Sequence, residues 1–167
     1  MGNIVITGAN RGIGLELCKQ FLAKGNRVFA TYRNNVGGLE EIDNPNLSTF
    51  KLDVRDATDV QSFASSIEGS VDVLINNAGV SDGRWQSISE IDMQHAMEVI
   101  EVNSISPVLV TQKFESKLKS GSKIVMMSSL MGSISDCMSG RSYAYRASKT
   151  ALNMFSMAMK NELENQG

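Results

Sequence analysis

The hydrophobic residues of this chain recur with two different spacings. Short apolar runs rich in valine and isoleucine, such as Ile4-Val5-Ile6, are typical of buried strands. Longer segments repeat apolar residues every three or four positions, as amphipathic helices do. The pattern predicts strands at residues 3–7, 27–32, 49–52, 71–75 and 123–128. It predicts helices at residues 12–24, 56–67, 93–119 and 143–165.

This alternation of strands and helices is typical of βαβ units and a parallel sheet, so we predict an α/β, doubly wound Rossmann fold. Gly25 is placed to end the first helix, and Asp56 to cap the start of the second. No repeat or linker divides the chain, and we expect residues 1–167 to form a single domain. A complete fold of this kind has about six strands, so we expect its C-terminal strands to be missing here.

Composition narrows the classes of partner. Of the 167 residues, 42% are hydrophobic and 20% are charged, which fits a globular domain with a core. The formal net charge of -2 provides no broad basic surface for phosphate backbones or anionic lipids. No apolar run approaches the roughly 18 residues of a membrane span. We therefore expect neither nucleic acid nor a membrane as a partner.

The two cysteines, Cys18 and Cys137, have no Cys or His neighbour at metal-ligand spacing. We therefore predict free thiols and no metal site, as is typical of a reducing compartment. The sequence passes directly from Met1 into the first predicted strand, without a charged and apolar leader. The expected location is the cytoplasm.

A glycine-rich turn, Thr7-Gly8-Ala9-Asn10-Arg11-Gly12-Ile13-Gly14, joins the first predicted strand to the first helix. Glycines let the backbone turn tightly and approach a pyrophosphate, whose charge then lies at the helix N-terminus. An ordinary strand-to-helix loop is the alternative interpretation.

The choice of dinucleotide depends on the end of the second strand. An acidic residue there binds the ribose 2′-OH of NAD, whereas an arginine accommodates the 2′-phosphate of NADP. This chain has Arg33 at that place, with Arg11 in the turn as a second cation. We therefore expect NADP(H) rather than NAD(H), although both arginines are also compatible with a solvated surface.

Candidate catalytic groups lie in the last third of the chain. Tyr145 and Lys149 are four residues apart, so they share one face of the last helix, and a nearby cation favours the phenolate that proton transfer requires. Ser128 and Ser129 end the fifth predicted strand, at the edge where open α/β sheets bind ligands. Taken alone, the pair on the helix is also compatible with a solvated surface, and the serines with a polar strand end.

Asn103 is a further candidate, because Pro107 lies four residues later in the same predicted helix and has no N–H to donate to it. A local kink at this point is expected either to bind a water near Lys149 or simply to shape the packing.

Taken in order, these motifs resemble the classical short-chain dehydrogenase/reductase family. The match consists of TGxxxGxG, here TGANRGIG, then Asn76-Asn77-Ala78-Gly79, then the serine, and YxxxK from Tyr145 to Lys149. The run SSLMGSISD followed by SYAYRASKTALNM is similar to the branch of sniffer-type carbonyl reductases and bacterial C-factor proteins. The resemblance implies an NADP(H)-dependent oxidoreductase that transfers hydride between the nicotinamide and a small carbonyl or alcohol substrate.

The resemblance also implies roles. Tyr145 would be the general acid/base, Lys149 would favour its ionised form and hold the nicotinamide ribose, and Ser129, the second of the serine pair, would polarise the substrate carbonyl. Asn103 would anchor a relay water. The cofactor-binding residues expected from the turn and the resemblance are Gly8, Asn10, Arg11, Gly12, Ile13, Gly14, Arg33, Asp53, Val54, Asn76, Asn77, Ala78, Gly79, Tyr145 and Lys149. Asp53 and Val54 would contact the adenine.

Family members continue into a further strand, a PG-containing turn, a substrate-binding loop and a final strand, none of which this sequence contains. The fifth strand would then have an unpaired edge. The resemblance implies a homodimer through the two long helices, and Met154, Met157 and Met159 suit a core or a helix interface. We predict no catalytic or metal role for His95, and we expect Trp85 to pack in a loop rather than to line a substrate entrance.

Three functions follow from these observations. The first is an active NADPH-dependent carbonyl reductase, and the second a catalytically silent NADP(H)-binding or signalling module. The third is an interaction protein that binds no dinucleotide. Turnover that depends on Tyr145 separates the first from the second, and dinucleotide binding separates both from the third.

Overall fold

A computed structural model of the chain describes residues 2–82 and 87–164. The chain divides into two compact units, which we describe separately. The sheet unit comprises residues 1–78 and 109–127, and the helical unit comprises residues 79–108 and 128–167.

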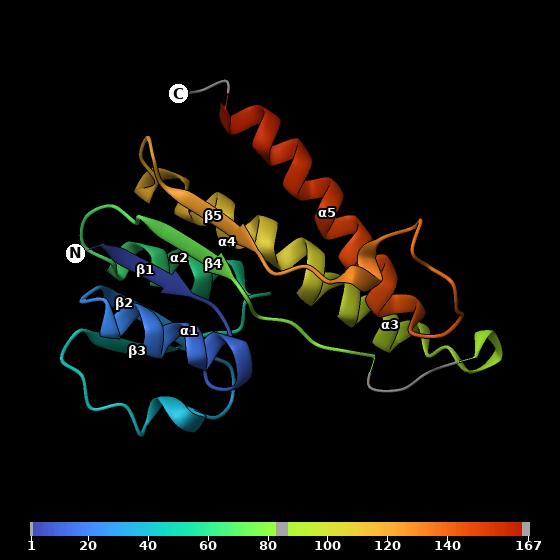
Figure 1. The fold of residues 1–167 in the computed structure, drawn as a ribbon, viewed down its shortest axis with the longest axis horizontal. Helices are drawn as coiled ribbons and strands as arrows, with labels where there is room; N and C mark the ends of the chain where they lie inside the picture. The colour runs from blue at the N-terminus through green and yellow to red at the C-terminus, as the bar shows by residue number, and fades with distance from the viewer. Residues whose placement is uncertain (1, 83–86, 165–167) are drawn as a thin grey trace. The chain divides into compact units, whose positions relative to one another are not determined.

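The sheet unit contains five parallel strands in the order β3-β2-β1-β4-β5 (Figure 1). The strands are β1 (Asn3–Ile6), β2 (Arg27–Tyr32), β3 (Leu47–Lys51), β4 (Val73–Asn76) and β5 (Lys123–Met126). The register places Val5 of β1 beside Phe29 of β2 and Leu74 of β4. The strand order reverses between β1 and β4, and ligands of open α/β sheets bind beyond the carboxyl ends of the strands at such a reversal.

One face of the sheet packs against α1 (Gly12–Ala23), which Lys24 caps and which is followed by Gly25 with φ of 75°. Alternate strand residues face α1, because side chains in a strand point to opposite faces in turn. The resulting cluster joins Ile4, Ile6, Val28, Ala30 and Ile75 to Cys18 and Leu22 of α1. Burial in this cluster raises the pKa of the Cys18 thiol to about 12.

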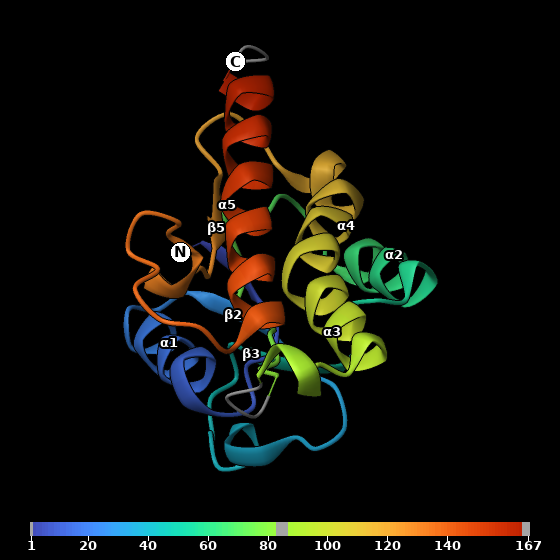
Figure 2. The ribbon, with the colours of Figure 1, turned by 90° about the vertical axis from the view of Figure 1, so that its right-hand side faces the viewer.

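The other face of the sheet carries α2 (Ala57–Ser66) and the end of α4 (Ser106–Phe114) (Figure 2). Aromatic rings join these elements. Their centroids are 6.4 Å apart for Phe29 and Phe50, 4.9 Å for Phe50 and Phe63, and 5.5 Å for Phe63 and Phe114. These distances are typical of stabilising aromatic pairs. Asp56 caps α2 as predicted, since its carboxylate accepts from the amides of Thr58 and Asp59.

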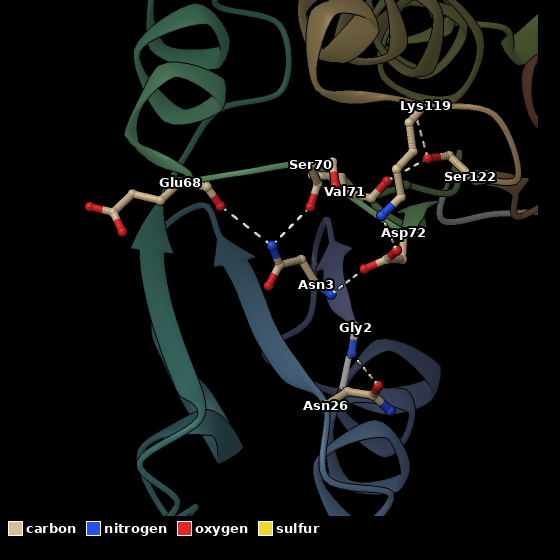
Figure 3. Close-up of polar contacts among 9 residues, drawn as sticks. All are labelled: Gly2, Asn3, Asn26, Glu68, Ser70, Val71, Asp72, Lys119 and Ser122. Carbon is tan, nitrogen blue, oxygen red and sulfur yellow. Dashed lines mark hydrogen bonds and ion pairs between the residues drawn. The ribbon is translucent and has the colours of Figure 1, made fainter.

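Polar contacts join β1, β4 and the segment before β5 at the amino edge of the sheet (Figure 3). Asp72 accepts a hydrogen bond from the Asn3 amide at 2.7 Å and lies 3.0 Å from Lys119 Nζ. The Asn3 amide and Lys119 hold the pKa of Asp72 below its ordinary value of 3.8. The Asn3 side chain donates to the carbonyl of Ser70, and the Ser122 hydroxyl donates to that of Val71. These contacts fix the sheet edge opposite the carboxyl ends of the strands.

The helical unit is built around α5 (Tyr143–Glu164), the long helix that ends nearest the C-terminus (Figure 1). It packs against α3 (Met93–Ile100) and against a five-residue π-helical turn, Glu101–Ile105, which we call the π-turn. A short 3-10 turn, Leu130–Gly132, packs on another part of α5. We call it the serine turn, because Ser129 is its N-cap residue.

The predicted strands and helices are all present, and most of their ends differ from prediction by one or two residues. One prediction is wrong: residues 93–119 do not form a continuous helix. The π-turn interrupts it and ends two residues before Pro107, which cannot donate a backbone hydrogen bond to Asn103, and the α-helix ends at Phe114. The predicted distortion at Asn103 is thus confirmed, in the form of a π-turn. Sequence patterns did not predict the short 3-10 turns.

Within residues 2–82 and 87–164, no helix is both long and apolar enough to span a bilayer.

Candidate functional site

The glycine-rich turn follows β1 at the reversal of strand order. Gly8 and Gly12 have φ of 63° and 58°, in the left-handed region that favours glycine. A Cβ at Gly14 would lie 2.5 Å from Asn77 Nδ2, and one at Gly8 would lie 2.7 Å from the Cα of Ala78. The turn therefore requires glycine for both its backbone angles and its close contact with the segment after β4.

The start of α1 has the features of an anion site. The N-cap residue, Arg11, makes no side-chain capping hydrogen bond, and the first turn of α1 contains no acidic residue. A Cβ at Gly12 would meet no described atom within 4 Å, and Ile13 is exposed. Amide groups at a helix N-terminus attract negative charge when no side chain satisfies them.

Thr7 and Asn77 join the glycine-rich turn to the segment after β4. The Thr7 hydroxyl accepts hydrogen bonds from the amides of Asn77 and Ala78, each at 3.0 Å. Asn77 Nδ2 donates to the carbonyls of Thr7 and Gly8, at 3.0 and 2.9 Å. Because both acceptors of the side chain are carbonyls, the orientation of the Asn77 amide is unambiguous. Asn77 thus joins the segment after β4 to the backbone of the glycine-rich turn.

Asn10 has a supporting position. Its side chain donates to the carbonyl of Asn35 at 3.0 Å, and its own carbonyl accepts from the Gly38 amide at 3.1 Å. These contacts join the glycine-rich turn to the loop after β2, which begins with the exposed Arg33. We infer that Asn10 places this loop beside the turn.

Asp53 pairs with Arg55, whose guanidinium lies 2.6 Å from its carboxylate. Hydrogen bonding to Arg55, assisted by the charge of Arg33, holds the pKa of Asp53 below its ordinary value of 3.8. The contribution of Arg33 places this cation near Asp53. The side chain of the next residue, Val54, is buried.

Asn76 ends β4 with its side chain in the core. Its Nδ2 donates to Thr111 Oγ1 at 3.2 Å and to Met126 Sδ at 3.4 Å. Its Oδ1 is buried and has no hydrogen-bond partner in the described part of the chain. The contacts indicate that Asn76 ties β4 to α4 and β5.

In the helical unit, Tyr145 and Lys149 lie one turn apart on α5, and Lys149 Nζ is 5.7 Å from the centre of the Tyr145 ring. The Lys149 side chain is 6% exposed, and this burial lowers its pKa from the ordinary 10.5. An ammonium with little water around it interacts more strongly with a nearby phenol than a solvated one does. The two side chains therefore lie close enough for the cation to influence the phenol.

Ser148 connects this pair to the π-turn. Its hydroxyl donates to the Tyr145 carbonyl at 2.8 Å and accepts from Asn103 Nδ2 at 3.1 Å. The carbonyl of Ser148 accepts from the Ser104 hydroxyl at 2.8 Å. Asn103, Ser104 and Ser148 are all fully buried. The π-turn thus supplies two consecutive polar side chains to one point of the helix that carries Tyr145 and Lys149.

Asn103 also binds the segment that follows the Asn-Asn-Ala-Gly motif. Its Oδ1 accepts from the Val80 amide, and its Nδ2 donates to the Val80 carbonyl, both at 2.8 Å. The side chain of Asn103 therefore joins Val80 to Ser148 within the helical unit.

Ser129 lies on the serine turn, and its hydroxyl accepts from the Met131 amide at 3.2 Å. The hydroxyl hydrogen remains able to donate to a substrate oxygen. A Cβ at Gly132 would lie 2.8 Å from the Lys149 carbonyl carbon, so the turn approaches the α5 backbone closely at Lys149. Gly132 thus connects the serine turn, which Ser129 caps, to the helix that carries Tyr145 and Lys149.

Comparison with known proteins decides the family. The sequence profile of the short chain dehydrogenase family matches residues 2–167. The chain belongs to the short-chain dehydrogenase family.

Members of this family resemble the chain in sequence and in structure. C-signal of Myxococcus xanthus is 37% identical over 111 residues, which cover 65% of this chain and 66% of that protein. NADPH-bound carbonyl reductase from chicken fatty liver has a TM-score of 0.90 and 32% identity over 100% of this chain and 76% of its own. Carbonyl reductase Sniffer of D. melanogaster has a TM-score of 0.92 and 28% identity over 99% of this chain and 77% of its own. The chain thus spans about two thirds to three quarters of these relatives.

Several of the contacts described above were not predicted from the sequence. Thr7 and Ser148 lie inside the quoted motifs. Their contacts could have been suspected only because each is a polar residue, Thr7 at the end of a buried strand and Ser148 on a helix. Ser104 and Gly132 gave no such signal. Trp85 lies outside the described residues, and His95 lies 3.6 Å from Glu98 on α3.

Proposed function

We propose that this chain binds NADP(H) and transfers hydride between its nicotinamide and a small carbonyl or alcohol substrate, with Tyr145 as general acid/base. The observation that carries the proposal is the buried ammonium of Lys149, 5.7 Å from the centre of the Tyr145 ring. A cation close to a phenol favours the phenolate, and burial strengthens the interaction between the two groups.

The residues of the sheet unit fit a dinucleotide. The close contacts of Gly8 and Gly14 pack the turn against the segment after β4, and the uncapped start of α1 at the exposed Gly12 suits a pyrophosphate. Ala78 and Gly79 would lie beside the cofactor, and Asp53 and Val54 would contact the adenine. When bound, the dinucleotide supplies the hydride that reduces the carbonyl carbon.

Residues of this chain would transfer the proton and stabilise the charge that develops on the substrate oxygen. Ser129 Oγ–H would donate a hydrogen bond to the substrate oxygen, which stabilises negative charge as it develops there. Tyr145 Oη would donate its proton to the same oxygen and take one from the alcohol in the reverse direction. Lys149 would stabilise the resulting phenolate by its charge. Asn103 and Ser148 would keep the helix of Tyr145 and Lys149 in place through the π-turn.

Arg33 and Arg11 support NADP(H) rather than NAD(H). Arg33 follows β2, and Arg11 lies in the glycine-rich turn, which Asn10 joins to the loop after β2. Two guanidinium groups near the adenosine ribose suit a 2′-phosphate. We expect Arg33→Ala to weaken NADPH binding by about 10-fold or more, since hydrogen bonds between charged groups contribute roughly 1.5–3 kcal/mol. Binding of NADH should change little, and equal losses for both cofactors would contradict the assignment.

The test of the function is NADPH consumption with a panel of aldehydes and ketones. We expect Tyr145→Phe to lower kcat by at least about 100-fold, because general acid catalysis typically contributes that much. Tyr143→Phe removes the same hydroxyl two residues earlier on α5 and serves as the matched control. Absence of turnover by folded protein that binds NADPH would overturn the proposed function.

The second candidate is a dinucleotide-binding protein without turnover. A signalling role would suit such a protein, and the relative C-signal has a name of that kind. Calorimetry with NADPH, run beside the turnover assay, separates the two: binding without consumption supports the second candidate, and consumption supports the first.

We also propose a homodimer. Met154 and Met157 on α5 are 72% and 53% exposed, so they do not fill a core in this chain. Exposed methionines on a helix face suit an interface between copies of the chain. The double variant Met154→Glu with Met157→Glu should convert a dimer into a monomer in light scattering, whereas Met138→Glu, an equally apolar exposed position in a loop, should not.

A further inference from the structure

The side chain of Asn153 on α5 contacts the chain on both sides of Ser129. Its Oδ1 accepts from the Ser128 hydroxyl at 2.6 Å, and its Nδ2 lies 3.4 Å from the Gly132 carbonyl, which accepts from it. Asn153 therefore binds the residue immediately before Ser129 and the last residue of the serine turn that Ser129 caps.

The Gly132 carbonyl also lies near the hydroxyl of Thr150, which has a second carbonyl within reach. Thr150 Oγ1 lies 2.9 Å from the Gly132 carbonyl and 3.0 Å from the Arg146 carbonyl. A threonine hydroxyl has a single hydrogen, so it donates fully to only one of these carbonyls at a time. Asn153 Nδ2 supplies a donor to Gly132 when the Thr150 hydroxyl turns to Arg146.

The serine turn also contacts the backbone of α5 at Gly132. Gly132 approaches the Lys149 backbone so closely that a Cβ would lie 2.8 Å from the Lys149 carbonyl carbon. The contact at Gly132 determines how close the serine turn lies to α5. Asn153 holds the two ends of the serine turn by its hydrogen bonds to Ser128 and Gly132. The hydroxyl of Ser129, between those ends, is placed relative to Tyr145 through the same helix.

We propose that Asn153 is a positioning residue for Ser129. The proposal rests on the function proposed above, in which Ser129 donates to the substrate oxygen. Asn153 does not itself reach the reacting groups. It acts by holding Ser128 and Gly132, so that the Ser129 hydroxyl points to the place where charge develops. A displacement of about 1 Å at such a donor costs on the order of 100-fold in rate.

The two contacts of residue 153 require a side chain that both accepts and donates hydrogen bonds. One contact requires an acceptor, for the Ser128 hydroxyl, and the other requires a donor, for the Gly132 carbonyl. Asparagine has both within one planar group. Aspartate, which has nearly the same shape, keeps the acceptor and loses the donor, and alanine loses both.

The first test is turnover. We expect Asn153→Ala to lower kcat by about 10- to 100-fold with an unchanged Kd for NADPH, and Asn153→Asp to have a smaller effect. Asn161→Ala, the same substitution two turns later on α5, is the matched control and should leave kcat within about twofold. Because Asn153 acts through Ser129, the double variant Ser129→Ala with Asn153→Ala should be no slower than Ser129→Ala alone. Additive losses, or an unchanged kcat in Asn153→Ala, would overturn the proposal.

The second test does not depend on activity. The amides of Met131, Gly132 and Ser133 are bonded within the serine turn, to Ser129 or Leu130. If Asn153 holds the turn, hydrogen exchange of these amides should be at least about 10-fold faster in Asn153→Ala than in Asn161→Ala. Unchanged exchange rates would overturn the proposal even in an active enzyme. Faster exchange in a chain without turnover would support the role of Asn153 in the turn and contradict the proposed function alone.

Discussion

Replacement of Asn77 by aspartate is the sharpest perturbation of the glycine-rich turn. The two side chains have nearly the same shape, but Asn77 Nδ2 donates to the carbonyls of Thr7 and Gly8 at 3.0 and 2.9 Å. A carboxylate at this position would present an oxygen to two carbonyl oxygens. The substitution therefore removes two hydrogen bonds and adds repulsion without changing the packing volume.

The magnitude follows from the contacts. Each lost hydrogen bond costs about 0.5–1.5 kcal/mol, and an acceptor left without a partner in a partly buried place costs roughly 1 kcal/mol more. We therefore expect Asn77→Asp to lower the free energy of unfolding by about 2–4 kcal/mol at neutral pH, a large part of the roughly 5–15 kcal/mol of an ordinary domain. Repulsion by the carbonyls raises the pKa of the new carboxyl, so the loss should shrink as the pH falls and the carboxyl regains a proton to donate.

Urea unfolding near pH 7 and again near pH 4.5 measures both effects, each relative to the unchanged protein at the same pH. Asn44→Asp is the matched control, because Asn44 uses its side-chain oxygen as the acceptor, for the Asn46 amide, and aspartate can do the same. Two results would refute the reasoning from these contacts. One is a free energy of unfolding of Asn77→Asp within about 0.5 kcal/mol of that of the unchanged protein near pH 7. The other is a loss of unfolding free energy that grows as the pH falls.

Three further predictions concern single side chains. Iodoacetamide should label the exposed Cys137 in the folded protein but spare Cys18, whose burial raises its pKa to about 12, and mass spectrometry should find both labelled after unfolding. Asp72 has a lowered pKa, so it contributes stability above about pH 4 that is lost as the pH falls through its folded pKa. In urea unfolding, Asp72→Asn should therefore show a weaker loss of stability below that pH. Gly132→Ala should destabilise the chain by about 1–3 kcal/mol, because its Cβ would meet the Lys149 backbone at 2.8 Å, and backbone cannot rotate away.

Each of these predictions has an outcome that contradicts it. Labelling of Cys18 at the rate of Cys137 in folded protein would mean that the cluster beneath α1 opens readily. Equal acid sensitivity of Asp72→Asn and the unchanged protein would mean that the amino edge of the sheet does not depend on that carboxylate. A fully stable Gly132→Ala would mean that the serine turn is looser than its contact with α5 indicates.

The fold was largely predictable because its signals are local. A strand alternates its side chains between two faces, so Ile4 and Ile6 repeat in sequence as they do against α1. The long helix at residues 93–119 was the exception. The apolar residues before and after the π-turn both follow a helical spacing, so the pattern did not show that the helix is interrupted. Pro107 predicted a distortion there but not its form.

The sequence by itself determined the family, the glycine-rich turn and the identity of Tyr145, Lys149 and Ser129 as candidates, because these residues stand at fixed spacings within short motifs. Only the tertiary structure decided which side chains hold them. Asn77 meets Gly8, and Asn153 meets Ser128, across 69 and 25 residues of chain. Contacts between such distant positions depend on how strands and helices pack, and no local spacing records them.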